Sequence, residues 1–406
     1  MQAVVKKSNI KGSVLAPPSK SMAHRMLICA GLSCGESLIE NIAYSEDILA
    51  TINCLKALGV KCKTYENSVK ISGVNIFNTN INSPLECNEC GSTLRFFIPI
   101  ALLLNKEVVL RGSKKLFSRP LSIYQDIAKE NGFLYIKKED SLVVKGKLKP
   151  SNYNIKGNIS SQFVTGMLFA LSLLGEGSVT FTTKVESRSY INLTIEALRA
   201  FGINVCFEGE NKIIVKKGST FKANNIYIEG DYSNAANLDI YNYIGGNIKI
   251  SGLNENSQQG DKIYKKYFEV LKQGFNTLDI SNCPDLGPVL FALASALKGG
   301  RFTGTARLKI KESDRALAMQ QELSKFGAKL EIFANEVVVE KADLHKPETA
   351  LFSHNDHRIV MALTALLTLF GGVINGVEAV NKSYPNFFQE LSNLNAEIDI
   401  NDVKQK

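Results

Sequence analysis

Residues 159–177 read ISSQFVTGMLFALSLLGEG: a polar turn, then an apolar run, then two glycines. The apolar side chains fall on every side of a helical wheel, which predicts a helix that is buried all round. Serine before such a run is typical of a helix N-cap, and glycine after it is typical of the C-terminal end. Five further segments follow the same pattern: residues 17–32, 90–104, 231–246, 284–300 and 355–372.

The six segments recur at a nearly constant spacing. The matching polar positions are 71, 69, 72, 52 and 71 residues apart: Ser21, Ser92, Ser161, Ser233, Asp285 and Asp356. A second, amphipathic helix usually ends at a glycine between them, as in LRAFGI (198–203), and short β-rich runs such as SLVVKG (141–146) follow it. We therefore expect an α/β (α+β) fold of six βαβαββ repeats, three in each of two domains. The buried helices should lie inside sheets, as in an inside-out α/β barrel.

Length and composition agree with a two-domain globular protein. The chain has 406 residues, more than the roughly 250–300 at which one hydrophobic core stops growing. It is 45% hydrophobic and 21% charged, which excludes a disordered chain, a collagen and a coiled coil. The apolar run 359–370 is shorter than the ~20 residues of a membrane span, and lysines interrupt every apolar run in residues 1–20. We predict a cytoplasmic protein.

The net charge and the cysteine content indicate which classes of ligand to expect. The net charge of +9 favours anionic partners, whether nucleic acid, a membrane surface or phosphorylated and carboxylated small molecules. The eight cysteines are typical of reduced thiols in a cytosolic protein. Cys87 and Cys90 form a CxxC pair, but no second pair or matching HxxxH accompanies it, so we expect no metal.

Basic residues gather at the starts of the predicted apolar helices. Lys20, Arg25, Arg95 and Arg358 lie at or near these starts. Further basic residues stand in other turns or at other helix starts: Arg119, Lys311, Arg315 and Lys382. Helix N-termini offer unpaired N–H groups to anions. Any one of these residues could instead belong to an ordinary cap or surface ion pair, but the set as a whole indicates an anionic ligand.

At these positions the sequence resembles the enolpyruvyl transferases. The resemblance runs from about residue 10 to residue 395 and rests on nine motifs in the order that the family has them. These are PPSKSMAHR (17–25), CGSTLR (90–95), SRP (118–120), SSQF (160–163), ESRSY (186–190), CPD (283–285), IKESDR (310–315), NDHR (355–358) and NKSYPNFF (381–388).

The resemblance implies a reaction and its ligands. The enolpyruvyl group of phosphoenolpyruvate would pass to the 5-hydroxyl of shikimate 3-phosphate, with release of phosphate, by addition and elimination through a tetrahedral intermediate. This is a step toward chorismate and the aromatic amino acids, and glyphosate would inhibit it at the phosphoenolpyruvate site beside Gly91. The broken bond is C–O and the sequence has no P-loop, so we expect neither metal nor cofactor. We also expect a monomer that binds neither nucleic acid nor membrane.

The resemblance also implies site residues. Asp285 matches the proton acceptor for the 5-hydroxyl, while Glu312 and Lys20 match groups of proton transfer at the methylene carbon and bridging oxygen. The residues implied to bind shikimate 3-phosphate are Lys20, Ser21, Arg25, Ser160, Ser161, Gln162, Ser187, Asp285 and Lys311. Those implied to bind phosphoenolpyruvate are Lys20, Gly91, Arg119, Gln162, Arg315, Arg358 and Lys382. Without the motifs, Asp285 would pass for a helix N-cap and Glu312 for an exposed acid at a helix start.

Three positions depart from the family pattern or stay open. Arg307 stands where some relatives have Asn, Phe96 stands where well-known members have Pro, and His357 is at most a minor contact. The resemblance further implies an N-terminal domain of residues 17–228 and a C-terminal domain of residues 1–16 plus 229–406. The two crossings would form a hinge, and anionic ligands that draw groups from both domains would close it.

Two alternatives remain. A UDP-N-acetylglucosamine enolpyruvyl transferase shares the architecture, but its members have Lys-Asn in the first turn and generally a reactive cysteine in a mobile loop. Here the turn is Lys20-Ser21, and the corresponding loop RGSKKLFSRP (111–120) has no cysteine. A basic ring that encircles nucleic acid without catalysis would need Lys and Arg on exposed helix faces, whereas here they flank turns beside buried helices.

Overall fold

The computed structural model describes residues 1–81 and 83–402. These residues divide into two compact units. The N-terminal unit is Pro18–Glu229, and the C-terminal unit joins Met1–Pro17 to the chain from Gly230 onward. Each unit has its own apolar core. The chain passes between the units at Pro17–Pro18 and Glu229–Gly230, one residue later at each crossing than the expected ranges.

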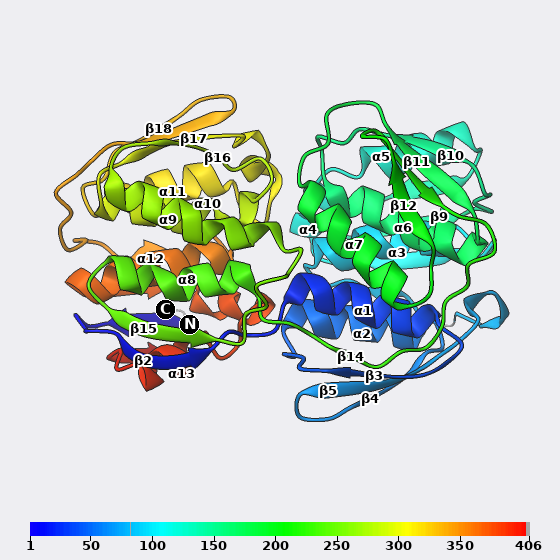
Figure 1. Ribbon diagram of the computed structural model, residues 1–406, viewed down its shortest axis with the longest axis horizontal. Helices are drawn as coiled ribbons and strands as arrows, with labels where there is room; N and C mark the ends of the chain where they lie inside the picture. Colours follow the sequence, from blue (N-terminus) through cyan, green and yellow to red (C-terminus); the bar gives the residue numbers. More distant parts are fainter. Residues whose placement is uncertain (82, 403–406) are drawn as a thin grey trace. The chain divides into compact units, whose positions relative to one another are not determined.

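The N-terminal unit contains three repeats along the chain (Figure 1). The first is α1 (Lys20–Leu32), β3 (Gly35–Glu40), α2 (Glu46–Ala57), β4 (Lys61–Thr64) and β5 (Ser68–Gly73), followed by the short η1 (Ile76–Asn78). The second is β6 (Leu85–Glu86), α3 (Gly91–Ala101), β7 (Val108–Arg111), α4 (Lys114–Ser118), α5 (Ser122–Glu130), β8 (Leu134–Lys137) and β9 (Ser141–Lys145). The third is β10 (Asn152–Ile155), α6 (Ser161–Leu174), β11 (Gly177–Phe181), α7 (Arg188–Ala200), β12 (Val205–Glu208) and β13 (Lys212–Val215), after which comes β14 (Ile226–Tyr227).

The sheets of this unit share one topology. In the third repeat the strand order is β10-β11-β13-β12; β10 runs parallel to β11, and β11, β13 and β12 are antiparallel neighbours. The second repeat has the same order, β6-β7-β9-β8. In the first repeat the leading place belongs to β14, where Ile226 lies opposite Ile39 of β3. The last strand of the unit therefore completes its first sheet.

The C-terminal unit begins with β1 (Gln2–Val5) and β2 (Lys11–Leu15) and continues after the second crossing. The fourth repeat holds α8 (Tyr232–Tyr243), β15 (Asn247–Ser251), η2 (Gly260–Ile263) and α9 (Tyr264–Gln273). The fifth holds β16 (Thr277–Asp279), η3 (Pro284–Leu286), α10 (Gly287–Ala296), β17 (Gly300–Thr303), η4 (Ala306–Ile310), α11 (Arg315–Ser324), β18 (Leu330–Ile332) and β19 (Glu336–Val339). The sixth holds β20 (Leu351–Phe352), α12 (His357–Phe370), β21 (Gly372–Asn375), η5 (Val377–Lys382), α13 (Phe387–Asn393) and β22 (Ile398–Asn401).

The N-terminal segment completes two sheets of this unit. β1 lies between β21 and β22 in the order β20-β21-β1-β22. β2 pairs in parallel with β15, with Lys11 opposite Asn247, and these two strands form the whole described sheet of the fourth repeat. The antiparallel hairpin of the first, second, third and fifth repeats has no counterpart among the described residues of the fourth. The missing hairpin explains why the fourth interval is only 52 residues long.

The first helix of each repeat is buried, as its apolar run predicts. In α6 the residues from Phe163 to Ser172 are all buried, Ser160 accepts a hydrogen bond from the Gln162 amide (3.3 Å), and Gly175 ends the helix with a φ of 79°. Within each unit these helices pack on one another, α3 against α6 and α10 against α12. In Figure 1, α1 and α2 cover one face of the sheet that contains β3, β5 and β4. The α/β fold of repeated units is therefore confirmed.

Of the helices in residues 1–81 and 83–402, none combines the length and the apolar character that crossing a membrane requires.

Candidate active site

Lys20 and Ser21 lie in the first turn of α1. Ser19 caps this helix by accepting a hydrogen bond from the Met22 amide (3.4 Å). The Lys20 Nζ lies 2.7 Å from Oδ2 of Asp47, which comes from the first turn of α2, and both side chains are about 15% exposed (16% and 15%). The cation predicted to touch both substrates thus stands at the edge of the buried region, oriented by a carboxylate.

The Arg25 guanidinium donates hydrogen bonds to four groups of the protein itself. Its Nε donates to Thr194 Oγ1 (2.9 Å), Nη1 donates to the carbonyl of Ser21 (2.6 Å), and Nη2 donates to the carbonyl of Tyr190 (3.0 Å) and Thr165 Oγ1 (3.4 Å). Only 3% of the residue is exposed, and burial lowers the pKa of its guanidinium to about 10. Arg25 therefore ties the start of α1 to α6 and α7.

Gln162, in the first turn of α6, has both ends of its amide fixed. Its Oε1 accepts from Arg95 Nη1 (2.6 Å), and its Nε2 donates to Ser92 Oγ (2.9 Å). Arg95 also donates to the carbonyl of Pro120 (3.0 Å). One buried guanidinium therefore sets the orientation of the Gln162 amide and holds the residue that follows Arg119.

Gly91 is the first residue of α3 and lies against Arg119. A Cβ atom at position 91 would stand only 2.7 Å from Arg119 Nη1. Arg119 ends α4 and is 9% exposed. The absence of a side chain at position 91 therefore leaves the space that the Arg119 guanidinium occupies.

The remaining predicted residues of this unit are serines at helix starts. Ser160 is the N-cap of α6 and Ser161 its first residue. Ser187 precedes α7 in a left-handed conformation with a φ of 56°, and it is 2% exposed. A non-glycine residue in this conformation is strained, a feature that gathers at functional sites.

In the C-terminal unit, Asp285 is surrounded by cations. Its Oδ1 lies 2.7 Å from Arg315 Nη1 and 3.1 Å from Lys311 Nζ, and its Oδ2 lies 3.7 Å from Arg358 Nη2. Burial alone would raise the pKa of Asp285, but Lys311, Arg315 and Arg358 outweigh burial and hold it well below the usual value. The carboxylate is therefore ionised at neutral pH and can accept a proton.

Arg315 is the centre of this cluster. Besides Asp285, it binds Glu312 Oε2 through Nη2 (2.8 Å) and Asp356 Oδ2 through Nε (2.8 Å). A longer bond joins Nη2 to Asp356 Oδ1 (3.4 Å), and the Arg315 side chain is 2% exposed. Arg315 directs most of its N–H groups toward three carboxylates, because its burial requires charge compensation.

Lys382 and Arg358 frame the start of α12. The Lys382 Nζ donates to the carbonyl and to Oδ1 of Asn355 (2.8 and 2.7 Å), and Lys382 is 6% exposed. His354 and Asn355 both have left-handed backbones, with φ of 50° and 57°. Asp356 then caps α12 by accepting from the Arg358 amide (2.9 Å). A strained turn held by Lys382 thus positions Arg358.

The sequence did not indicate which groups pair with the predicted site residues. Asp47 pairs with Lys20, Arg95 orients Gln162, Asn355 accepts from Lys382, and Asp356 pairs with Arg315. A usable signal existed for Asp356, which occupies the same position of its repeat as Asp285. Asp47 lies 27 residues from Lys20 and Arg95 lies 67 residues from Gln162, distances at which no local pattern links two residues.

The three positions that depart from the family pattern or stay open are all buried. The Phe96 ring packs edge-on against Phe169 and lies 5.4 Å from the Arg25 guanidinium carbon. Arg307 donates to the carbonyl of Ser281, and His357 is the first residue of α12 with 2% of its surface exposed. The buried Phe96 ring therefore packs beside the Arg25 guanidinium and does not line an exposed surface.

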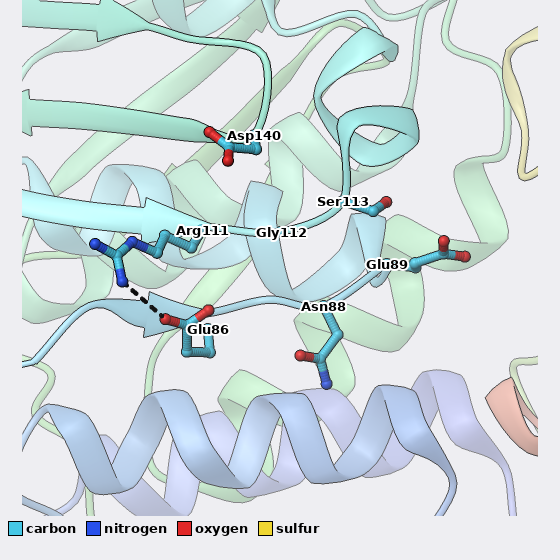
Figure 2. A pocket seen from close by; sticks show the side chains of 7 residues that line it. All are labelled: Glu86, Asn88, Glu89, Arg111, Gly112, Ser113 and Asp140. Atoms are coloured by element: carbon cyan, nitrogen blue, oxygen red, sulfur yellow. Dashed lines mark ion pairs between the residues drawn. The ribbon is translucent and has the colours of Figure 1, made fainter.

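A pocket in the N-terminal unit is lined by none of the predicted residues (Figure 2). It has a volume of about 350 Å³ and is lined by Glu86, Asn88, Glu89, Arg111, Gly112, Ser113 and Asp140. Figure 2 shows Arg111 directed at Glu86, an ion pair of 3.8 Å. Three carboxylates against one guanidinium repel an anionic substrate, so this pocket does not suit the predicted ligands.

Comparison with known proteins identifies the family of this chain. The family model of EPSP synthase (3-phosphoshikimate 1-carboxyvinyltransferase) matches residues 4–391. Curated relatives with the name 3-phosphoshikimate 1-carboxyvinyltransferase include one from Clostridium kluyveri, 41% identical, and one from Clostridioides difficile, 38% identical. Each match covers 97% of this chain and 97% of the relative.

Solved structures share the fold over nearly the whole chain. An EPSP synthase from Acinetobacter baumannii superposes with a TM-score of 0.77 at 24% identity, covering 98% of this chain and 99% of that one. The enolpyruvyl transferase NikO from Streptomyces tendae has a TM-score of 0.76 at 13% identity, covering 98% of each. The fold, the order of the motifs and the full-length relatives agree: this chain belongs to the EPSP synthase (3-phosphoshikimate 1-carboxyvinyltransferase) family.

Proposed function

We propose that this protein transfers the enolpyruvyl group of phosphoenolpyruvate to the 5-hydroxyl of shikimate 3-phosphate and releases phosphate. The observation that carries the proposal is the 41% identity, over 97% of both chains, to a 3-phosphoshikimate 1-carboxyvinyltransferase. The reaction serves the shikimate pathway, which leads to chorismate and the aromatic amino acids. The buried clusters of cations around helix starts supply the electrostatic environment that such anionic substrates need.

Charge supports the choice of ligands. Each substrate carries one phosphate and one carboxylate, so the pair brings about five to six negative charges at neutral pH. We assign phosphoenolpyruvate to Lys20, Gly91, Arg119, Gln162, Arg315, Arg358 and Lys382. We assign shikimate 3-phosphate to Lys20, Ser21, Arg25, Ser160, Ser161, Gln162, Ser187, Asp285 and Lys311. Hydroxyls, an amide and cations are the donors that a phosphorylated polyol requires.

Proton transfer falls to Asp285, Glu312 and Lys20 in this proposal. Asp285 takes the proton of the 5-hydroxyl as that oxygen attacks the substituted carbon of phosphoenolpyruvate. The surrounding cations keep Asp285 ionised but also make it a weak base. An anionic substrate beside Lys311 and Arg358 would offset their charge and raise the basicity of Asp285 when the substrate is bound.

Arg315 has a structural part in this mechanism as well. It contacts Asp285 and Glu312 with separate nitrogens, Nη1 and Nη2 (2.7 and 2.8 Å). The same guanidinium therefore sets the distance between the proposed base and the second proton-transfer group, in addition to any contact with phosphoenolpyruvate.

The test is phosphate release. The purified protein should release phosphate from phosphoenolpyruvate with shikimate 3-phosphate as acceptor and not with UDP-N-acetylglucosamine. Glyphosate should inhibit in competition with phosphoenolpyruvate. Release with UDP-N-acetylglucosamine instead would assign the chain to the other acceptor, and release with neither would contradict the proposal.

The proposal includes a cytoplasmic monomer that uses no cofactor and binds no nucleic acid. It also includes a hinge at the two crossings, because the residues assigned to each substrate come from both units. Small-angle scattering should then show a smaller radius of gyration when shikimate 3-phosphate and glyphosate are both bound. An unchanged radius at saturation, with binding measured separately, would contradict closure.

A further inference from the structure

Three side chains with different metal-binding atoms meet beside Lys20. His24 comes from α1, Asp47 from α2 and Cys90 from the residue before α3, and their ligand atoms all lie within 4.8 Å of one another. The Nε2 of His24 is 3.9 Å from the Cys90 sulfur. His24 and Cys90 are 1% and 2% exposed, whereas the Asp47 side chain is 15% exposed and gives access from solvent. None of the three is assigned to a substrate or to proton transfer in the proposed function.

His24 is oriented as metal-binding histidines are. Its Nδ1 lies 2.7 Å from Thr51 Oγ1, which in turn lies 2.7 Å from Thr93 Oγ1. A hydrogen bond at Nδ1 directs Nε2 toward Cys90 and fixes the ring, which is the usual second contact of a histidine ligand. Burial, helped by Lys20 and Arg25, lowers the pKa of His24 well below its usual value, so the imidazole is neutral and can coordinate.

We propose that His24, Asp47 and Cys90 bind a thiophilic divalent cation of the zinc type, through Nε2, one carboxylate oxygen and the sulfur. Nitrogen, sulfur and carboxylate oxygen are the ligands that zinc takes in proteins. Tetrahedral zinc with bonds of about 2.0–2.3 Å needs ligand separations of roughly 3.3–3.8 Å. The His24–Cys90 distance of 3.9 Å is close to this range, and Asp47 has to approach by about 1.5 Å at most.

Metal binding at this site balances in charge and in protons. Cys90 loses its thiol proton to solvent when the metal binds, and the thiolate and carboxylate together neutralise the dication without any redox change. The sulfur caps α3 by accepting from the Thr93 amide (3.4 Å), a helix end that favours a thiolate. The metal therefore competes with a proton for the Cys90 sulfur.

Occupation of this site would act on Lys20. The carboxylate that the metal takes is the one that lies 2.7 Å from the Lys20 Nζ. A dication beside the ammonium repels it and removes its partner, so Lys20 should leave its position. Given the proposed function, zinc should therefore inhibit turnover reversibly.

Metal binding can be tested without any assay of activity. The full chain, freed of metals with a chelator, is titrated with Co²⁺ and followed by absorption. We expect a sulfur-to-cobalt charge-transfer band and tetrahedral d–d bands that saturate at one equivalent. Cys90→Ser keeps an oxygen that can cap α3 and should lose the charge-transfer band, whereas Cys34→Ser, which changes an exposed thiol, should keep it.

A second variant guards against misfolding at position 90. Thr51→Val removes the hydroxyl that orients His24 but leaves all three ligands, and it should weaken Co²⁺ binding by roughly 10–100-fold. Circular dichroism and urea unfolding verify that each variant folds. No saturating band in the unaltered chain, or a band that survives Cys90→Ser or disappears in Cys34→Ser, would overturn the site.

Inhibition is the second readout. Zn²⁺ should slow phosphate release by the unaltered chain, a chelator should restore it, and Cys90→Ser should resist the metal. Equal inhibition of the unaltered chain and Cys90→Ser would overturn the link to Lys20. If the unaltered chain shows no turnover even without metal, the result counts against the proposed function. The cobalt titration alone then decides whether the metal site exists.

Discussion

At the scale of single residues, Asp285 combines full ionisation with contact to three cations. Replacement by Asn keeps its shape but removes the charge that accepts the proton, so Asp285→Asn should lower turnover by about 10²–10⁴-fold. Binding of shikimate 3-phosphate, measured by calorimetry, should survive. Asp279→Asn, an exposed carboxylate of the same repeat, is the matched control and should leave turnover unchanged. Near-normal turnover of Asp285→Asn would show that another group takes the proton.

Gly91 should affect ligand binding through its neighbour Arg119. The Cβ of an alanine would lie 2.7 Å from Arg119 Nη1, and the end of that flexible side chain can move away. Gly91→Ala should therefore fold normally but weaken phosphoenolpyruvate and glyphosate by up to ~1.5–3 kcal/mol, the worth of a charge-assisted contact. Gly274→Ala, where an added Cβ meets nothing within 4 Å, is the control. Titration calorimetry that finds both variants equal would separate Gly91 from the function of Arg119.

At the scale of elements, a buried chain of hydrogen bonds ties α1, α2 and α3 together through His24, Thr51 and Thr93. Burial is the main reason that the pKa of His24 lies well below its usual value. Below about pH 6.5 the unfolded chain therefore binds a proton that the folded chain does not. As the pH drops below this value, the free energy of unfolding should decrease. The contribution of His24 to this decrease is about 1.4 kcal/mol per pH unit, until the pH reaches the pKa of His24 in the folded protein.

Urea unfolding between about pH 7 and about pH 5.5 measures this slope. His24→Gln should reduce the slope, whatever it does to the stability at neutral pH, because the titrating group is gone. A slope that His24→Gln does not change would mean that His24 is protonated in the folded protein.

At the scale of the whole molecule, the two units differ in how the chain builds them. The N-terminal unit is continuous from Pro18 to Glu229 and supplies its own closing strand, β14. Residues 18–229 should therefore fold alone. The C-terminal unit takes a central strand and the sole described partner of β15 from residues 1–17.

A fragment of residues 230–406 should consequently fail to fold. It lacks the buried side chains of Val5, Ile10 and Val14, each worth about 1.5–3 kcal/mol, against a total stability of about 5–15 kcal/mol. Co-expression of residues 1–17 should restore a cooperative urea transition. Cooperative unfolding of 230–406 by itself would show that β1 and β2 are dispensable.

The sequence alone determined those features of this protein that depend on neighbours a few residues apart. The six apolar helices and the repeat spacing are local patterns, and the structure confirms them. A serine or aspartate caps four of these helices, whereas Cys90 caps α3 and no side chain caps α10. A glycine is the C-cap of α6 and α12. The motifs were readable for the same reason, since PPSKSMAHR and IKESDR each place their predicted site residues within six consecutive positions.

The tertiary structure alone decided which distant residues meet. Strand exchange by β1, β2 and β14 joins segments hundreds of residues apart, and only pairing reveals that the fourth repeat lacks its hairpin. The three carboxylates around Arg315 belong to two repeats, and Asp356 lies 41 residues from it. Burial of a charge demands a partner but does not specify where in the chain that partner lies, so folding had to bring these groups together.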